Sequence, residues 1–204
     1  MQELRLCLVT NIGDRPLSQY IDFIKKAIAG GVTMVQLREK SIGYEKMKAR
    51  AIALQDILRP LNIPLIINDF VELAAEADAD GAHVGNSDMS ALIAREKLGP
   101  NKIIGVSIES LQDIENANKL PINYVAASAL FPSITKLNCK TFWGIDGLKK
   151  IVEKSIHPVI AIGGIKPCYV QDIINTGAAG VAVISAIHDA KDPYKAARSF
   201  YYAQ

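Results

Sequence analysis

The chain has 204 residues, half of them hydrophobic, which is enough for one sizeable core and short for two domains. Its formal net charge is +2, acidic and basic residues are interspersed, and aromatic residues make up 6%, so a nucleic-acid partner is not expected. Apolar runs are too short for a signal peptide or a transmembrane helix, so we predict a cytoplasmic protein with no membrane partner.

The cysteines are far apart in the sequence, at Cys7, Cys139 and Cys168. An odd number without a CxxC pair argues against a disulfide framework or a structural zinc site. We therefore expect reduced thiols, as in the cytosol, with Cys7 in the core because it lies within an apolar run.

Apolar runs and amphipathic runs alternate from one end of the chain to the other. The predicted strands are residues 4–11, 33–39, 64–70, 81–85, 102–108, 122–130, 157–164 and 180–187. The predicted helices are residues 17–31, 44–60, 71–78, 90–99, 111–119, 144–154, 168–177 and 194–204. Near-continuous apolar strands separated by helices indicate a parallel sheet that is covered by helices.

Eight such units favour a single α/β domain over residues 1–204, a (β/α)8 TIM barrel. The alternative is an open doubly wound sheet, which often carries a glycine-rich fingerprint after its first strand; "NIGDRPLS" is no such fingerprint. The long irregular stretch 131–143 is typical of a functional lid. The aromatic end of the chain, "ARSFYYAQ" at 197–204, is compatible with core packing and with a homo-oligomer interface.

The active site of a barrel lies at the carboxyl ends of its strands. At the end of the second strand, Gln36, Arg38 and Lys40 share one face because residues two apart point the same way. With Lys136 after the sixth strand, these cations suit an anionic ligand. The alternative is that such charges are solvated loop residues, and we expect this of Glu39, as a surface or ion-pair residue.

A second anion site is predicted at Gly163 and Gly164, which separate the seventh strand from a helix that begins near Pro167. Glycines let backbone N–H groups approach a phosphate, and the loops after strands seven and eight usually form the phosphate site of this fold. Ser185 adds a hydroxyl donor. The alternative reading of the glycine pair is a tight turn.

Carboxylates follow two successive strands, at Asp69 and Asp88. Next to an anionic site, two carboxylates suit Mg²⁺, which takes oxygen ligands and substrate phosphates. Alternatively, each aspartate caps the helix that follows it. His83 lies within the fourth strand and is expected to be a core residue. Two phosphate sites, one of them with Mg²⁺, are typical of an enzyme that expels a diphosphate.

The motifs "VQLREK", "IIND", "GAHVGNSDM", "GVS", "FPSITK", "AIGGI" and "GVAVISAI" occur in this order. With them the chain resembles the thiamine-phosphate synthase family over almost its whole length. The resemblance implies a (β/α)8 enzyme that joins hydroxymethylpyrimidine diphosphate to thiazole phosphate and releases pyrophosphate with Mg²⁺. It also implies a dissociative mechanism, in which pyrophosphate leaves a pyrimidine carbocation that the thiazole nitrogen attacks.

The resemblance implies a role for each site residue. The pyrimidine diphosphate would be bound by Gln36, Arg38, Lys40, Asn68, Ser107 and Lys136, of which Arg38, Lys40, Ser107 and Lys136 would be catalytic. The metal would be held by Asp69 and Asp88. The thiazole phosphate would be bound by Ser133, Thr135, Gly164, Ile184 and Ser185.

The chain departs from the family pattern at several positions. Asn86-Ser87 replace a usual Gln-Glu, Phe70 stands where an arginine is frequent, and residues 126–129 replace a usual Gly-x-Gly-Pro. Larger side chains at 126–129 are expected to narrow the pocket. Other readings are therefore a thiazole-phosphate tautomerase, a non-catalytic thiamine- or thiazole-phosphate binding protein, and a generic sugar-phosphate barrel enzyme.

Overall fold

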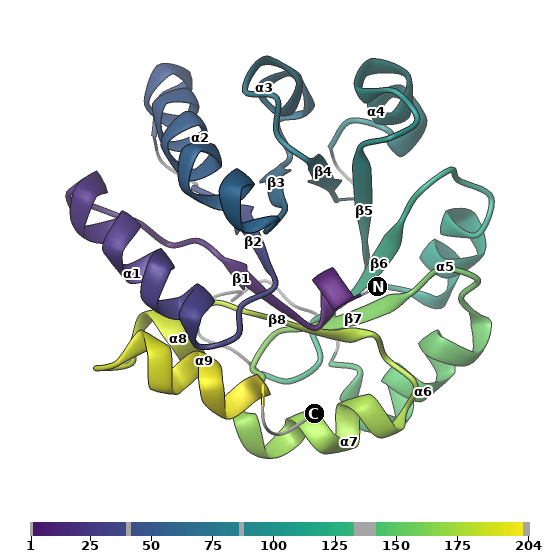
Figure 1. The fold of residues 1–204 in the computed structure, drawn as a ribbon. Helices are drawn as coiled ribbons and strands as arrows, with labels where there is room; N and C mark the ends of the chain where they lie inside the picture. Colours follow the sequence, from purple (N-terminus) through teal and green to yellow (C-terminus); the bar gives the residue numbers. More distant parts are fainter. Residues whose placement is uncertain (1, 40–41, 86–87, 133–141, 202–204) are drawn as a thin grey trace.

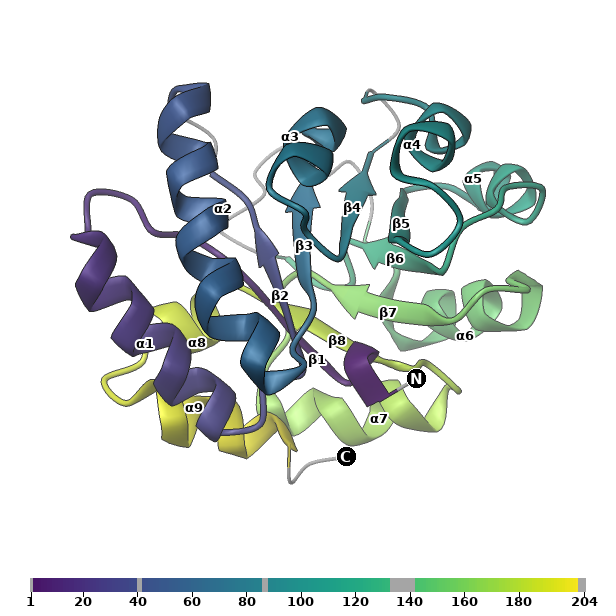
Figure 2. The same ribbon diagram turned by 45° about the horizontal axis from the view of Figure 1, so that its top comes forward.

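The structure, a computed structural model, describes residues 2–39, 42–85, 88–132 and 142–201. Its strands form a closed barrel in the order β1 to β8, and every neighbouring pair is parallel, including the closing pair of β1 and β8. The helices lie outside the ring of strands in both views (Figures 1 and 2). The predicted (β/α)8 barrel is confirmed, and the open doubly wound sheet is excluded.

The strands occupy short segments within the predicted apolar runs. They are β1 (Leu6–Val9), β2 (Met34–Leu37), β3 (Leu65–Asn68), β4 (Gly81–Val84), β5 (Ile103–Ile108), β6 (Tyr124–Ser128), β7 (Val159–Ile162) and β8 (Gly180–Val183). Each predicted run is longer than its strand because it includes residues of the flanking loops. The loop residues that follow the strands hold most of the predicted site.

Each predicted helical run contains an α-helix. The α-helices are α1 (Leu17–Ala29), α2 (Tyr44–Leu58), α3 (Val71–Glu76), α4 (Ala91–Leu98), α5 (Leu111–Ala117), α6 (Gly144–Lys154), α7 (Val170–Asn175), α8 (Ser185–His188) and α9 (Pro193–Tyr201). The short 3-10 helices are η1 (Gln2–Leu4), η2 (Arg59–Leu61) and η3 (Pro167–Tyr169). Helix α8 was not predicted: residues 180–187 were expected to be one strand, but β8 ends at Val183 and the chain turns into α8 from Ser185.

Two separate apolar cores follow from the period of two along each strand. One face of the strands packs against the helices and forms the larger core. The other face fills the barrel with a smaller core of Leu4, Cys7, Val9, Met34, Ile66, Tyr124, Ala126, Ile160 and Ala182. Cys7 belongs to this inner core, as predicted, and its burial raises the pKa of the thiol to about 12. The barrel is therefore a packed core and not a pore.

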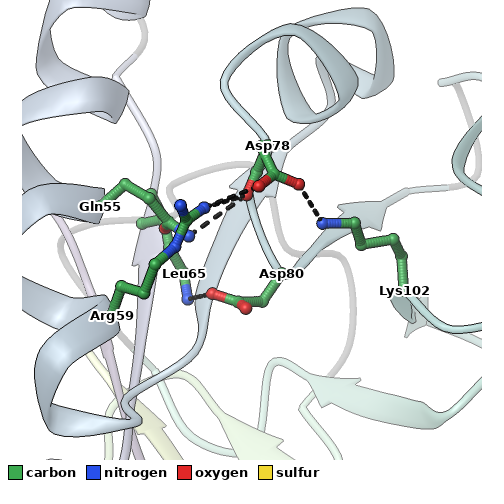
Figure 3. Close-up of polar contacts among 6 residues, drawn as sticks. All are labelled: Gln55, Arg59, Leu65, Asp78, Asp80 and Lys102. Atoms are coloured by element: carbon green, nitrogen blue, oxygen red, sulfur yellow. Dashed lines mark hydrogen bonds and ion pairs between the residues drawn. The ribbon is translucent and has the colours of Figure 1, made fainter.

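The amino ends of β3, β4 and β5 are joined by a polar cluster (Figure 3). Asp78 accepts from Arg59 at 2.8 Å and from Lys102 at 2.7 Å, while the Asp80 carboxylate accepts from the Leu65 N–H at 2.8 Å. The Gln55 amide also donates to the Asp78 carbonyl, at 3.2 Å. These contacts tie η2 and the loops before β4 and β5 to the barrel, at the end opposite the cavity described below.

The end of the chain packs against its beginning. Helix α9 lies beside α1 in both views, and Phe200 is fully buried in the outer core (Figures 1 and 2). The Tyr201 ring lies beneath the Arg5 guanidinium, 4.9 Å from it. Core packing thus explains Phe200, whereas Tyr194 and Tyr201 are exposed, so the interface reading stays open for them. Among the described residues, none of the helices is both long and apolar enough to cross a membrane.

Candidate functional site

A cavity of about 790 Å³ opens at the carboxyl ends of the strands. It is lined by residues that follow or end β2 to β8. Of the predicted site residues, those that the structure describes all line it: Gln36, Arg38, Asn68, Asp69, Asp88, Ser107, Gly164, Ile184 and Ser185. The other predicted residues, Lys40, Ser133, Thr135 and Lys136, lie outside the described residues. So do Asn86, Ser87 and most of the predicted lid, 133–141.

Side chains at the end of β2 point to two opposite faces, as the period of two predicts. Gln36 and Arg38 line the cavity. Glu39 points the other way: it accepts from Thr10 Oγ1 and from the Ile12 N–H, both at 2.9 Å, and it pairs with Arg50 at 3.3 Å. Its side chain is only 6% exposed. The expectation of a solvated Glu39 is therefore wrong, and the ion-pair alternative is confirmed.

This buried pair also holds the backbone at Arg38. The Thr10 hydroxyl that donates to Glu39 accepts from the Arg38 N–H at 2.9 Å, and Arg50 donates to the Gly13 carbonyl at 3.0 Å. The loop after β1 is thereby attached to the end of β2. The guanidinium of Arg38 starts from a fixed backbone position.

Asp69 has a left-handed backbone, with φ of 66°. The turn is held by a hydrogen bond from the Asp69 N–H to the His83 carbonyl and by another from the Phe70 N–H to the Asn68 carbonyl, both 2.8 Å. Such a conformation is uncommon outside glycine, asparagine and aspartate, and it clusters at functional sites. Phe70 is the N-cap of α3, so the alternative reading of Asp69 as the helix cap is wrong.

Asp88 is also no helix cap. The N-cap of α4 is Ser90, whose hydroxyl accepts from the Leu92 N–H. The Asp88 carboxylate instead accepts from the Gly85 N–H at 2.7 Å, and the Asp88 N–H donates to the Gly85 carbonyl at 3.2 Å. This turn holds the carboxylate at the cavity wall next to β4.

The two carboxylates lie close enough to affect each other. The pKa of Asp69 is raised to about 7 by partial desolvation, then by a hydrogen bond to Asp88 and by the Asp88 charge; Arg38 and Asn68 oppose the shift. A carboxylate whose pKa is raised by a neighbouring carboxylate is typical of a functional site, and a bound cation would relieve the repulsion.

Donor chemistry here suits a hard cation. Among the described residues no group of three His, Cys, Asp or Glu side chains is placed to hold a metal ion. Two carboxylates alone fit Mg²⁺, because this ion keeps several waters and takes its remaining ligands from substrate phosphates. They do not fit a structural zinc ion, which needs four protein ligands.

The glycine pair lies where two loops meet. Gly163 and Gly164 have φ of 103° and 64°. A Cβ at Gly163 would lie 2.7 Å from the Ala129 Cβ, and one at Gly164 would lie 2.5 Å from the Pro132 carbonyl oxygen. The Phe131 N–H donates to the Gly163 carbonyl at 3.0 Å. The positive φ angles and the close neighbours explain both glycines without a ligand, but both also line the cavity, so the tight-turn and anion-site readings stay open.

Sequence reasoning missed several residues of the cavity. His83, Glu109, Ser128, Lys166 and Asp189 also line it. His83 is buried, as predicted for a core residue, but its Nε2 lies 3.0 Å from the hydroxyl of Ser107. Its position follows from the register, since His83, one residue before the end of β4, is the partner of Asn68 at the end of β3. The substituted stretch 126–129 also reaches the site, through Ser128 and Ala129.

Comparison with known proteins places these features in a family. The model of the family described as thiamine monophosphate synthase matches residues 6–187. The chain is 48% identical to thiamine-phosphate synthase of Vibrio campbellii over 200 residues, covering 98% of this chain and 97% of the relative. It is 41% identical to thiamine-phosphate synthase of Chlamydia caviae, over 93% of this chain and 89% of that one.

Solved structures agree with this assignment. Thiamine phosphate pyrophosphorylase from Pyrococcus furiosus superposes with a TM-score of 0.89 at 33% identity, over 99% of this chain and 96% of that chain. A 3-hexulose-6-phosphate synthase superposes with a TM-score of 0.73 at 18% identity, over 98% of this chain and 99% of that one. The second likeness is one of fold alone.

Proposed function

Because the chain belongs to the thiamine monophosphate synthase family, we propose that it joins 4-amino-2-methyl-5-hydroxymethylpyrimidine diphosphate to 4-methyl-5-(2-hydroxyethyl)thiazole phosphate. The products are thiamine phosphate and pyrophosphate, so the enzyme is a transferase. The observation that carries the proposal is one cavity that combines a guanidinium, a carboxylate pair and a glycine-rich loop. A substrate with a diphosphate and a partner with a monophosphate together need such a set.

The diphosphate end of the pyrimidine substrate is assigned to the β2 and β3 side of the cavity. Arg38 suits a bidentate grip of phosphate oxygens, and Asn68 adds an amide donor. Lys40 and Lys136 are proposed as further cations. Asp69 and Asp88 would hold Mg²⁺, which would neutralise diphosphate charge when bound.

The thiazole phosphate is assigned to the opposite side of the cavity, around β7 and β8. Gly164, Ile184 and Ser185 line that wall. Backbone N–H groups near glycine and the Ser185 hydroxyl are suitable phosphate donors. Ser133 and Thr135 complete this proposed subsite. The two phosphate sites would then lie on opposite sides of the cavity, and the two heterocycles would meet between them.

The proposed reaction is dissociative. The bond between the pyrimidine methylene carbon and the diphosphate oxygen breaks first, and its electron pair leaves with pyrophosphate. The resulting carbocation is stabilised by the amino group of its own ring. The lone pair of the thiazole nitrogen then forms the new carbon–nitrogen bond. Such chemistry needs positioning and charge stabilisation more than a general base, which suits a cavity with Arg38 and Ser107 at its wall.

The test is pyrophosphate release by the purified full chain with both substrates and Mg²⁺. Controls omit one substrate at a time or add a chelator. Release that needs both substrates and the metal supports the proposal. Binding of either phosphate compound without release would instead favour the tautomerase or the non-catalytic binding protein, and the Ser128 and Ala129 wall would be the first place to examine. A cytoplasmic location and a homo-oligomer stay predictions.

A further inference from the structure

A line of polar side chains crosses the barrel interior at the floor of the cavity. The His83 ring has its Nδ1 3.0 Å from the Tyr124 hydroxyl and its Nε2 3.0 Å from the Ser107 hydroxyl. The Gln36 side chain hydrogen-bonds to the same Tyr124 hydroxyl. The line therefore joins Gln36 and Ser107, two residues of the proposed pyrimidine site, through two residues that the proposed reaction does not use.

The strand register explains why this line forms. His83 pairs with Gly105 and Gly105 pairs with Tyr124, so the three residues lie side by side on β4, β5 and β6. A Cβ at Gly105 would lie 2.1 Å from Tyr124 Cζ, so only glycine lets the tyrosine ring cross to His83. The two ring centroids are 5.5 Å apart. Ser107 lies two residues beyond Gly105, on the same face and nearer the cavity.

The direction of the hydrogen bonds along the line follows from Tyr124. Its ring is fully buried, and this burial raises the pKa of the hydroxyl, which therefore keeps its proton. An amide N–H of Gln36 can donate to the same phenol oxygen, which accepts there while its O–H donates elsewhere. The Tyr124 O–H then has His83 Nδ1 as its acceptor.

The protonation of His83 then sets the direction of the hydrogen bond to Ser107 at the cavity. A neutral imidazole that accepts at Nδ1 carries its proton on Nε2 and donates it to the Ser107 oxygen. Ser107 keeps its own hydrogen for a ligand. At the other end, Gln36 has used an N–H on Tyr124, so its carbonyl oxygen is left to accept from a ligand.

We propose that His83 and Tyr124 are positioning residues that hold the His83 proton on Nε2 and so make Ser107 a donor and Gln36 an acceptor toward the substrate. This inference rests on the proposed function, since it assigns both groups to the pyrimidine. An aminopyrimidine offers the complementary pair, an amino N–H and a ring nitrogen. An oxo analogue offers a carbonyl in place of the amino group and would face the Gln36 carbonyl oxygen, so it is rejected.

The first test needs no substrate. Nitrogen NMR of the ¹⁵N-labelled free protein reports which imidazole nitrogen is protonated, and comparison with His83→Gln identifies His83 among the three histidines. We expect protonated Nε2 and bare Nδ1 in the wild type, and a mixture of tautomers in Tyr124→Phe. A wild-type ring that is protonated at Nδ1 or at both nitrogens overturns the proposal. The NMR result does not depend on pyrophosphate release, so failure of this proposal can be distinguished from failure of the proposed function.

The second test is a double-mutant cycle on pyrophosphate release. Tyr124→Phe should lower kcat/KM for the pyrimidine diphosphate about tenfold, the value of one net hydrogen bond, and should have little effect when Ser107 is already alanine. Equal effects in both backgrounds overturn the proposal. Tyr20→Phe is the matched control, because Tyr20 is also buried against a histidine, 3.3 Å from His188 Nε2, and does not line the cavity.

Substitution of His83 itself distinguishes positioning from mere packing. His83→Gln places an amide N–H where Nε2 stood and should keep most of the activity, whereas His83→Leu fills similar space without a donor and should lose about tenfold. Binding of the amino and oxo pyrimidine alcohols should differ strongly in the wild type and less in Tyr124→Phe. If His83→Leu retains full activity and full discrimination between the two alcohols, the proposal is wrong.

Discussion

The two ends of the barrel treat their aspartates in opposite ways. At the amino ends, Asp78 lies between Arg59 and Lys102, and its pKa is lowered first by the hydrogen bond from Lys102 and then by the surrounding positive charge (Figure 3). At the carboxyl ends, Asp69 has Asp88 as its hydrogen-bonded neighbour, and its pKa is raised to about 7. Similar side chains thus meet cations at one end and each other at the other.

The difference separates structure from function along the barrel axis. A carboxylate whose charge is compensated by the protein stabilises the fold and needs nothing more. A carboxylate pair without such compensation costs stability until a ligand supplies the positive charge, and such costs are tolerated at functional sites. Among the described residues, Asp78 with its two cations thus lies at the amino end, and the Asp69–Asp88 pair lies at the mouth of the cavity.

Glu39 tests whether the effect of an acidic residue on stability depends on its cation partner or on the end of the barrel at which it lies. It lies near the carboxyl end but is buried and paired with Arg50 at 3.3 Å. Glu39→Gln leaves the Arg50 charge buried without its partner, so we expect a loss of about 3–5 kcal/mol in the free energy of unfolding, measured with urea. The control is Glu76→Gln at the exposed pair with Lys48, where about 1 kcal/mol or less is expected. Equal losses would contradict the comparison.

Loss of the Asp69 charge should act on activity. Asp69→Asn removes one of the proposed metal ligands, and pyrophosphate release should fall about 100-fold or more, or about 2.7 kcal/mol. Asp78→Asn, the same change at the other end of the barrel, should leave the rate within about twofold, because Asp78 is not among the residues that line the cavity. A slow Asp78→Asn enzyme with an intact fold would show that the two ends are not separate.

The Asp69 shift also predicts how stability depends on pH. The folded protein keeps on Asp69 a proton that the unfolded chain loses near pH 3.8, so the free energy of unfolding should fall as pH rises from about 4 to about 7. Asp69→Asn should remove this decline and be the more stable protein above pH 7. Because Asp69 is exposed to solvent, screening limits the gain to about 1 kcal/mol. Unfolding curves at pH 4, 6 and 8 measure it, and saturating Mg²⁺ should reduce it.

At the amino end, the pH dependence of stability has the opposite sign, and its expected size is the smallest of these predictions. The pKa of Asp78 is lowered, so its stabilising contribution is present above the unfolded value of 3.8 and is lost as pH falls through the folded pKa. The Asp78 side chain is 69% exposed, so Asp78→Asn should cost only a few tenths of a kcal/mol at pH 7 and less at pH 3. A gain in stability at pH 7, like that of Asp69→Asn, would remove the contrast between the two ends.

Much of the fold was predictable because its signals are local. Apolar runs, amphipathic stripes and terminal glycines lie within windows of about ten residues, and they placed each described strand and eight of the nine described α-helices in order. The exception is α8, since "VAVISAI" is apolar throughout and a strand cannot be told from a short buried helix by periodicity alone. The site residues at strand ends were predictable for the same reason, once a barrel was assumed.

What the sequence by itself determined is therefore the order of the elements and the residue types at the strand ends. Which residues touch was decided by closure of the barrel and by strand register. Asp88 meets Asp69 beside Arg38, Arg50 reaches Glu39, and Tyr124 reaches His83 over Gly105. The physical reason is that periodicity records which face a side chain is on, whereas the charge or hydroxyl opposite it comes from a distant strand or helix whose position only the packed core fixes.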